Sequence, residues 1–196
     1  PEDLPSSILG FTDAKWHGRI GWAPANGSFQ AFVTALRIIE GETVAGRWLE
    51  GIKANDAVDY PKNTAIVEAV GRGEVDLGFV NHYYLLRFLA EQGDSFPARN
   101  FYLQNDSGAL INVAGAGILD ASKNKKNAQT FIEYLLSESA QRYFAETTYE
   151  YPLAAGVDSV GAIPSLADIN PPEIDLGSLE DLRGTLSLMR EAGVIP

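Results

Sequence analysis

The chain has 196 residues, of which 45% are hydrophobic, so it is long enough to bury a core as one large domain or as two small ones. Its formal net charge of −11 argues against non-specific binding to nucleic acid or to an anionic membrane surface, because both require a basic face. The absence of cysteine excludes disulfides, thiolate metal sites, iron–sulfur clusters and cysteine nucleophiles. A cationic or metallic partner fits the negative net charge better than a polyanion does.

We expect neither a membrane span nor a signal peptide within the printed residues. No apolar run approaches the roughly 20 residues that span a bilayer. Residues 1–5 lack both the basic start and the apolar stretch of a signal peptide, and they read as part of a Pro/Ser linker. We therefore expect a soluble chain that is a mature or trimmed product.

The first elements form a strand, a tight turn and a helix. Residues 19–23 are a short apolar run typical of a strand, residues 24–27 predict a turn, and the apolar periodicity over 28–39 predicts a helix. A second helix is expected over 43–53. A third is expected from Asn63 or Thr64 to Gly71, with Asn or Thr suited to its N-cap.

The same order of elements then recurs. Residues 75–80 predict a strand, Asn81 and His82 a turn, and residues 83–91 a helix. Farther along we expect strands over 100–103, 110–119 and 149–153 and helices over 122–136 and 139–146. A Pro-rich linker over 163–172 leads to a last helix with a capping box at Ser178 and Asp181.

Strands that alternate with helices indicate an α/β fold with a largely parallel sheet. Ligands of such sheets bind at the carboxyl ends of the strands, against the helices that follow. Polar residues stand at that point in both strand–turn–helix units, namely Asn26, Gly27 and Ser28 in the first and Asn81, Tyr83 and Tyr84 in the second.

The turn at Asn26, Gly27 and Ser28 has two interpretations. A small, glycine-containing turn that opens a helix exposes backbone N–H groups at the positive end of the helix dipole, where an anion can bind. The ordinary alternative is an N-cap, in which Ser28 or Asn26 satisfies the helix start. The turn alone does not separate them.

Tyr83 and Tyr84 likewise have two interpretations. Two phenols directly after a strand project near its carboxyl end, and a phenolate is a hard oxygen donor suited to a small, highly charged cation such as ferric iron. The alternative is that both are half-buried packing residues with hydrogen-bonded hydroxyls. His82 precedes the pair, and we expect it to be a solvent-facing or capping residue outside the site.

An enzymatic alternative is a metal-dependent hydrolase that uses Asp56, Asp59 or Asp76. Nothing in the sequence places these carboxylates together, and surface or capping roles are the ordinary expectation. With only two histidines far apart, no nucleophile elbow and no P-loop, the common hydrolase and kinase signatures are missing. We therefore expect no enzyme.

Several segments together resemble the ferric-iron-binding receptors of bacterial ABC importers. The segments that carry this resemblance are 22–30, 81–84, 113–119 and 149–153, in the family's order and spacing. The similarity extends over nearly the whole chain. The tyrosine pair is the part that is specific for iron.

The resemblance implies a type II periplasmic-binding-protein-like α/β fold, with mostly parallel sheet lobes, crossing strands and a two-lobe cleft. Residues 1–112 with 165–196 would form the tyrosine-bearing lobe, and residues 113–164 would cross to the second lobe. Family members are longer, and the N-terminal part that supplies the opposite cleft wall and further ligands has no counterpart here. We expect apolar surface that this part would cover.

The resemblance also implies a site and its partners. The family's metal ligands fall on Tyr83 and Tyr84, and its anion-binding residues fall on Asn26, Gly27, Ser28, Asn63 and Asn81. Ferric iron (Fe3+) would bind as transported cargo with a synergistic anion such as carbonate, phosphate or an organic acid. The intact receptor would be a monomer in the periplasm, or a cell-surface lipoprotein, that serves an ABC importer permease. A binding protein for a small anion is the alternative.

Overall fold

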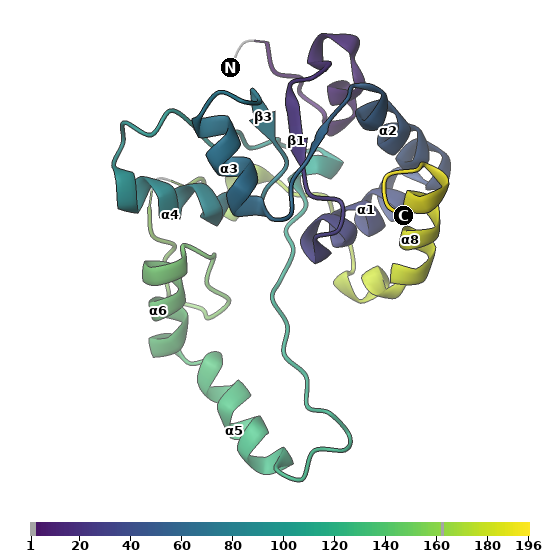
Figure 1. The fold of residues 1–196 in the computed structure, drawn as a ribbon. Helices are drawn as coiled ribbons and strands as arrows, with labels where there is room; N and C mark the ends of the chain where they lie inside the picture. Colours follow the sequence, from purple (N-terminus) through teal and green to yellow (C-terminus); the bar gives the residue numbers. More distant parts are fainter. Residues whose placement is uncertain (1–2, 162) are drawn as a thin grey trace. The chain divides into compact units, whose positions relative to one another are not determined.

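The computed structural model describes residues 3–161 and 163–196 (Figure 1). The chain divides into two compact units, of which the first combines Pro1–Asn112 with Leu166–Pro196. The second unit is the intervening segment Val113–Ser165. Within the described ranges, no helix has both the length and the apolar character that a membrane span requires.

A three-stranded parallel sheet lies at the centre of the first unit, in the order β2-β1-β3. The strands are β1 (Ile20–Trp22), β2 (Val58–Asp59) and β3 (Leu77–Gly78). Gly21 of β1 pairs with Val58 on one side and with Gly78 on the other. A Cβ atom on Gly78 would lie 2.0 Å from the Ile66 Cγ2 atom, so this glycine lets a helix approach the sheet closely. The expected parallel α/β sheet is confirmed.

Helices are the main regular elements of the first unit (Figure 1). They are α1 (Gly27–Glu40), α2 (Glu42–Ala54), α3 (Asn63–Gly71), α4 (His82–Gln92), α7 (Leu166–Ile169) and α8 (Leu182–Glu191). Short 3-10 turns complete it, namely η1 (Ile8–Thr12), η2 (Ala14–Trp16), η3 (Ser107–Ala109) and η4 (Leu176–Glu180). The predicted helices over 28–39, 43–53, 63–71 and 83–91 are confirmed within two residues. In α1, α2 and α3 several apolar side chains are buried at helical spacing, whereas among the described residues of α4 only Leu85 is buried.

The core of the first unit is centred on Trp48 of α2. Its side chain is almost fully buried, and its ring contacts Phe29 of α1 and Phe79 just after β3. The Trp48 indole Nε1 donates to the Ile8 carbonyl at 2.9 Å, so the buried ring keeps its polar group paired. This hydrogen bond joins the N-terminal 3-10 turn to α2.

The C-terminal helix α8 packs on α1 although the two are far apart in sequence. The hydroxyls of Thr34 and Thr185 hydrogen-bond at 2.7 Å in a buried setting. Arg37 donates to the Thr185 hydroxyl at 2.8 Å and forms ion pairs with Glu42 and Asp181. Residues separated by 151 positions therefore share one core.

Three predicted strands are wrong. Residues 100–103, 110–119 and 149–153 are not strands in the structure. An extended segment becomes a strand only when a neighbour pairs with its backbone, and the sheet formed by the described residues contains only β1, β2 and β3. In addition, Tyr149 has a left-handed backbone (φ 61°) at the end of a helix, which does not fit a strand start.

Two predicted helix caps are also wrong. The residue before α3 is Lys62, and Asn63 is already the first helical residue, so neither Asn63 nor Thr64 is the N-cap. The last helix is capped by Asp181 and not by Ser178. The Asp181 carboxylate accepts a hydrogen bond from the Gly184 N–H at the start of α8. Residues 176–180 form the 3-10 turn η4 instead, which shifts the helix start.

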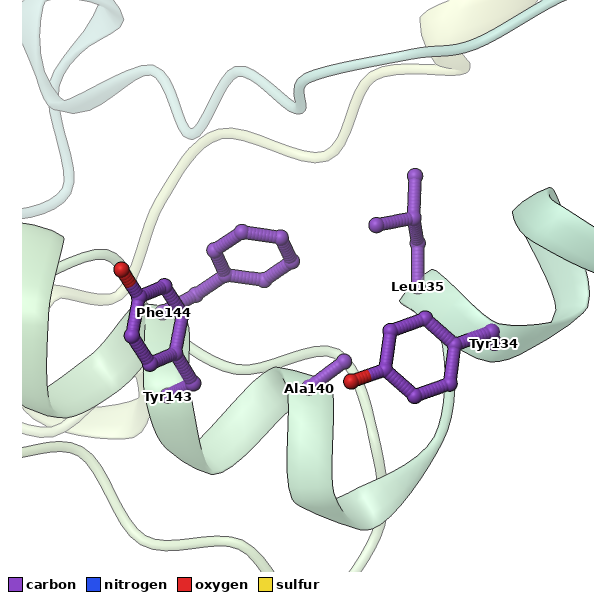
Figure 2. A pocket seen from close by; sticks show the side chains of 5 residues that line it. All are labelled: Tyr134, Leu135, Ala140, Tyr143 and Phe144. Carbon is purple, nitrogen blue, oxygen red and sulfur yellow. The ribbon is translucent and has the colours of Figure 1, made fainter.

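The second unit contains two helices, α5 (Lys125–Leu135) and α6 (Glu138–Thr148). The Ser137 hydroxyl accepts a hydrogen bond from the Ala140 N–H and caps α6. A pocket of about 280 Å³ lies between the helices, and Figure 2 shows the side chains around it, namely Tyr134, Leu135, Ala140, Tyr143 and Phe144. Helix α5 has no buried residue among those described, so this unit exposes an apolar face.

Candidate metal and anion site

The sheet topology brings three helix starts to one edge of the first unit. Strands β1, β2 and β3 are parallel, and α1, α3 and α4 follow them in the chain. The carboxyl ends of parallel strands lie on the same side of the sheet. Asn26, Asn63 and Asn81 therefore stand at comparable positions, each at or beside the start of one of these helices.

The turn before α1 is an N-cap in the structure. The Asn26 Oδ1 atom accepts hydrogen bonds from the Ser28 N–H at 2.9 Å and from the Ser28 hydroxyl at 2.6 Å. A Cβ atom on Gly27 would meet no heavy atom within 4 Å, so the space in front of the turn is open. An anion could approach Gly27 directly, but it would have to compete with Asn26 for the donors of Ser28.

The first turn of α3 holds an unpaired polar group. Asn63 is only 3% exposed, and its Nδ2 atom is buried without a hydrogen-bond partner among the described residues. A buried donor that lacks an acceptor costs roughly 1–3 kcal/mol. A ligand that brings acceptor oxygens to this edge would satisfy it.

The two tyrosines lie together in the first turn of α4. Their ring centroids are 4.6 Å apart at an interplanar angle of 36°. Asn81 Nδ2 donates to the Tyr83 hydroxyl oxygen at 3.1 Å. Tyr84 packs against the apolar cluster around Leu85 and Phe96. One phenol is thus held by a hydrogen bond and the other by packing, and both keep part of their surface exposed.

Arg87 lies one helical turn beyond the pair and covers both rings. Its guanidinium carbon is 5.3 Å from the Tyr83 centroid and 5.6 Å from the Tyr84 centroid, within the range of cation–π contact. We did not predict this residue from sequence. The spacing of three and four positions from two helical tyrosines is a signal that could have identified it.

His82 has neighbours that the sequence did not indicate. Its ring meets Tyr83 edge-on, with centroids 5.5 Å apart, and it also lies 6.5 Å from the Tyr102 ring. The Asn100 side chain donates to the His82 carbonyl at 2.9 Å. No short-range pattern in the sequence links residues 82, 100 and 102, so this part of the site required the structure.

The carboxylates of the hydrolase alternative do not form a site. Asp76 pairs with Arg19, and Asp56 pairs with His17 at 3.0 Å, both at the protein surface. Residues 3–161 and 163–196 contain no group of three or more histidine, aspartate or glutamate side chains arranged to hold a metal. The geometry at the sheet edge instead combines two phenols with amide and backbone donors.

Comparison with known proteins identifies the family. The family model described as bacterial extracellular solute-binding protein matches residues 1–169. The chain is 34% identical to the major ferric iron-binding protein of Neisseria meningitidis over 195 residues, covering 98% of this chain and 59% of that protein.

Solved structures show the same fold. Iron-bound HitA from Pseudomonas aeruginosa superposes with a TM-score of 0.92 at 35% identity, covering 98% of this chain and 62% of HitA. A Trichodesmium protein in complex with iron and citrate superposes with a TM-score of 0.82 at 26% identity, covering 98% of this chain and 65% of that one. The chain thus spans about three fifths of the length of these proteins. It has a type II periplasmic-binding-protein-like fold and belongs to the bacterial extracellular solute-binding proteins.

Proposed function

We propose that this chain is part of an extracytoplasmic receptor that binds ferric iron, with Tyr83 and Tyr84 as metal ligands and with no catalytic activity. The observation that carries the proposal is the tyrosine pair, with ring centroids 4.6 Å apart, at the sheet edge where three helices begin. Relatives that are named as ferric-iron-binding proteins support the choice of metal.

The chemistry of the two phenols supports ferric iron over softer metals. A phenol has a pKa near 10, so it ionises at neutral pH only when a strong Lewis acid replaces its proton. The hydroxyl of Tyr83 already accepts a hydrogen bond from Asn81. This bond can persist in the phenolate, where a charged acceptor strengthens it.

We propose that a synergistic anion binds beside the metal at Asn26, Gly27, Ser28, Asn63 and Asn81. The unpaired Asn63 Nδ2 atom and the open space before Gly27 support an acceptor-rich ligand at this edge. Carbonate, phosphate and an organic acid all supply such oxygens. The Trichodesmium protein was solved with iron and citrate, which supports the organic acid among these.

We infer that the receptor works in the periplasm or at the cell surface and delivers iron to an ABC importer permease. In this proposal, residues 1–112 with 165–196 form the tyrosine-bearing lobe and residues 113–164 belong to a second lobe. The further metal ligands would come from the part of the longer relatives that this chain does not span. The chain alone should therefore hold iron more weakly than a complete receptor.

Titration with a ferric salt and a weak chelator tests the proposal. We expect a visible phenolate-to-iron charge-transfer band that the double change Tyr83→Phe with Tyr84→Phe abolishes. The matched control is Tyr134→Phe with Tyr143→Phe, because these two tyrosines are more than half exposed in the second unit. A band that survives the first double change, or no band in the unchanged protein, would refute the assignment.

A second candidate is a binding protein for a small anion alone, in which the tyrosines only pack. The buried, unpaired amide of Asn63 is the observation that favours it. Calorimetry with phosphate, carbonate and citrate in iron-free buffer separates the two functions. Tight anion binding that the tyrosine changes leave intact would favour the second candidate.

A further inference from the structure

The His82 carbonyl at the start of α4 accepts a hydrogen bond from a side chain outside the helix. Asn100 Nδ2 donates to the His82 oxygen at 2.9 Å, and the same nitrogen donates to the Tyr102 hydroxyl oxygen at 3.1 Å. Asn100 lies 18 positions after His82, in a segment that is neither helix nor strand. One amide group therefore ties the first turn of α4 to Tyr102.

This tie matters because the helix start has little local capping. The N-cap residue Asn81 makes no side-chain hydrogen bond to the backbone of α4, and its amide donates to the Tyr83 hydroxyl instead. The first turn contains both Tyr83 and Tyr84. Any movement of that turn would shift the two phenols together, so a tertiary hydrogen bond to its backbone fixes their position.

The aromatic neighbours of His82 extend the same support. The His82 ring meets Tyr83 at 81° and Tyr102 at 47°. Burial raises the pKa of the Tyr102 phenol, so Tyr102 stays neutral at physiological pH. A neutral Tyr102 can hold the Asn100 amide without adding charge beside the tyrosine pair.

We propose that Asn100, braced by Tyr102, is a positioning residue that fixes the first turn of α4 and so sets the geometry in which Tyr83 and Tyr84 meet the ferric ion. This inference rests on the proposed function. Asn100 acts through the His82 carbonyl and does not touch the metal. Removal of an outer-shell partner of this kind typically lowers metal affinity about 10–100-fold.

The main variant is Asn100→Leu, which keeps the approximate size of the side chain and removes its two donors. We expect about a 10-fold loss of ferric affinity in competition with citrate, together with a shift of the charge-transfer band. Tyr102→Phe should change both quantities in the same direction but less. Gln104→Leu is the matched control, because Gln104 is an exposed amide in the same segment, and it should leave both unchanged.

A second measurement does not depend on iron. In the iron-free protein, the NMR resonances of the Tyr83 and Tyr84 rings should shift in Asn100→Leu and stay in place in Gln104→Leu. If Asn100→Leu fails to fold, Tyr102→Phe carries the test, since it keeps the ring and loses only the hydroxyl.

The two readouts separate the possible failures. Ring resonances, affinity and band that are all unchanged in Asn100→Leu would overturn the positioning role while the iron assignment stands. Absence of a band in the unchanged protein would overturn the iron assignment and, with it, the role of Asn100 in iron binding. A loss of affinity without any change in the band or in the ring resonances would also count against positioning.

Discussion

At the scale of single residues, Asn63 has a buried amide nitrogen for which the described residues provide no acceptor. Its neighbours at the sheet edge differ in this respect. Asn26 accepts both donors of Ser28, and Asn81 donates to Tyr83. Of these three asparagines, Asn63 is therefore the one whose amide nitrogen is buried without an acceptor from the described residues, and an incoming acceptor oxygen would satisfy it without breaking a hydrogen bond to the protein.

Asn63→Leu tests this difference. In anion-free, iron-free buffer the free energy of unfolding should stay within about 1 kcal/mol of the unchanged protein, because the substitution also removes an unsatisfied donor. Phosphate or citrate should raise the melting temperature of the unchanged protein but not that of Asn63→Leu, since only a ligand of the folded state stabilises it. Equal stabilisation of both proteins would place the anion elsewhere.

At the scale of elements, α1, α2 and α8 meet around Arg37. Its side chain is only 10% exposed and pairs with Glu42 and Asp181. The hydrogen bond from Arg37 lowers the pKa of Glu42. The Gly184 N–H, and then Arg37, lower the pKa of Asp181. A carboxyl group whose pKa is lowered in the folded protein stabilises that protein when the pH is above the ordinary pKa of the group, which is 4.5 for Glu42 and 3.8 for Asp181. This stabilisation is lost as the pH falls.

Arg37→Met should destabilise the protein by about 1–2 kcal/mol at pH 7, because it leaves the Thr185 hydroxyl and the Asp181 carbonyl short of a donor. The difference should shrink between about pH 5 and pH 2, where protonation of Glu42 and Asp181 weakens the same contacts in the unchanged protein. Urea unfolding at pH 7 and pH 3 measures both effects. Arg47→Met on the exposed side of α2 is the control, and a difference independent of pH would contradict this account.

The elements also show which parts of the structure could be predicted from the sequence. Helices such as α1 and α2 were predictable because their apolar periodicity is a local property. Strands such as 110–119 were not, because a strand needs a partner that local sequence does not specify. At the candidate site, the position of Tyr83 and Tyr84 after a strand was predictable from local sequence, whereas the contact of Asn100 and Tyr102 with the start of α4 is tertiary and spans 18 residues.

At the scale of the whole molecule, the two units differ in how they bury apolar side chains. The first unit encloses large side chains such as Trp48 and Leu36, whereas Phe131 and Tyr143 of the second are 60% exposed. Exposed apolar area of this kind marks a surface that associates with other polypeptide. The exposed apolar face on α5 and α6 is consistent with the apolar surface that we expected from the sequence.

Phe131→Ser should reduce the fluorescence of a hydrophobic dye bound to the protein. It should change the free energy of unfolding by less than about 0.5 kcal/mol, because an exposed side chain contributes little packing. Dye titration with parallel urea unfolding measures both quantities. Leu36→Ser, at a fully buried position of α1, should instead destabilise the protein strongly. Strong destabilisation by Phe131→Ser would mean that α5 is packed more tightly than its exposure indicates.

The buried bond between Thr34 and Thr185 also bears on how the protein is made. The second unit lies within the sequence of the first, so α1 emerges from the ribosome long before α8 does. Until α8 is made, the surface of α1 around Thr34 and Arg37 lacks the partner that α8 provides. The nascent first unit should therefore be open to chaperones and proteases throughout synthesis of the second, and it should complete its core only after α8 has left the ribosome.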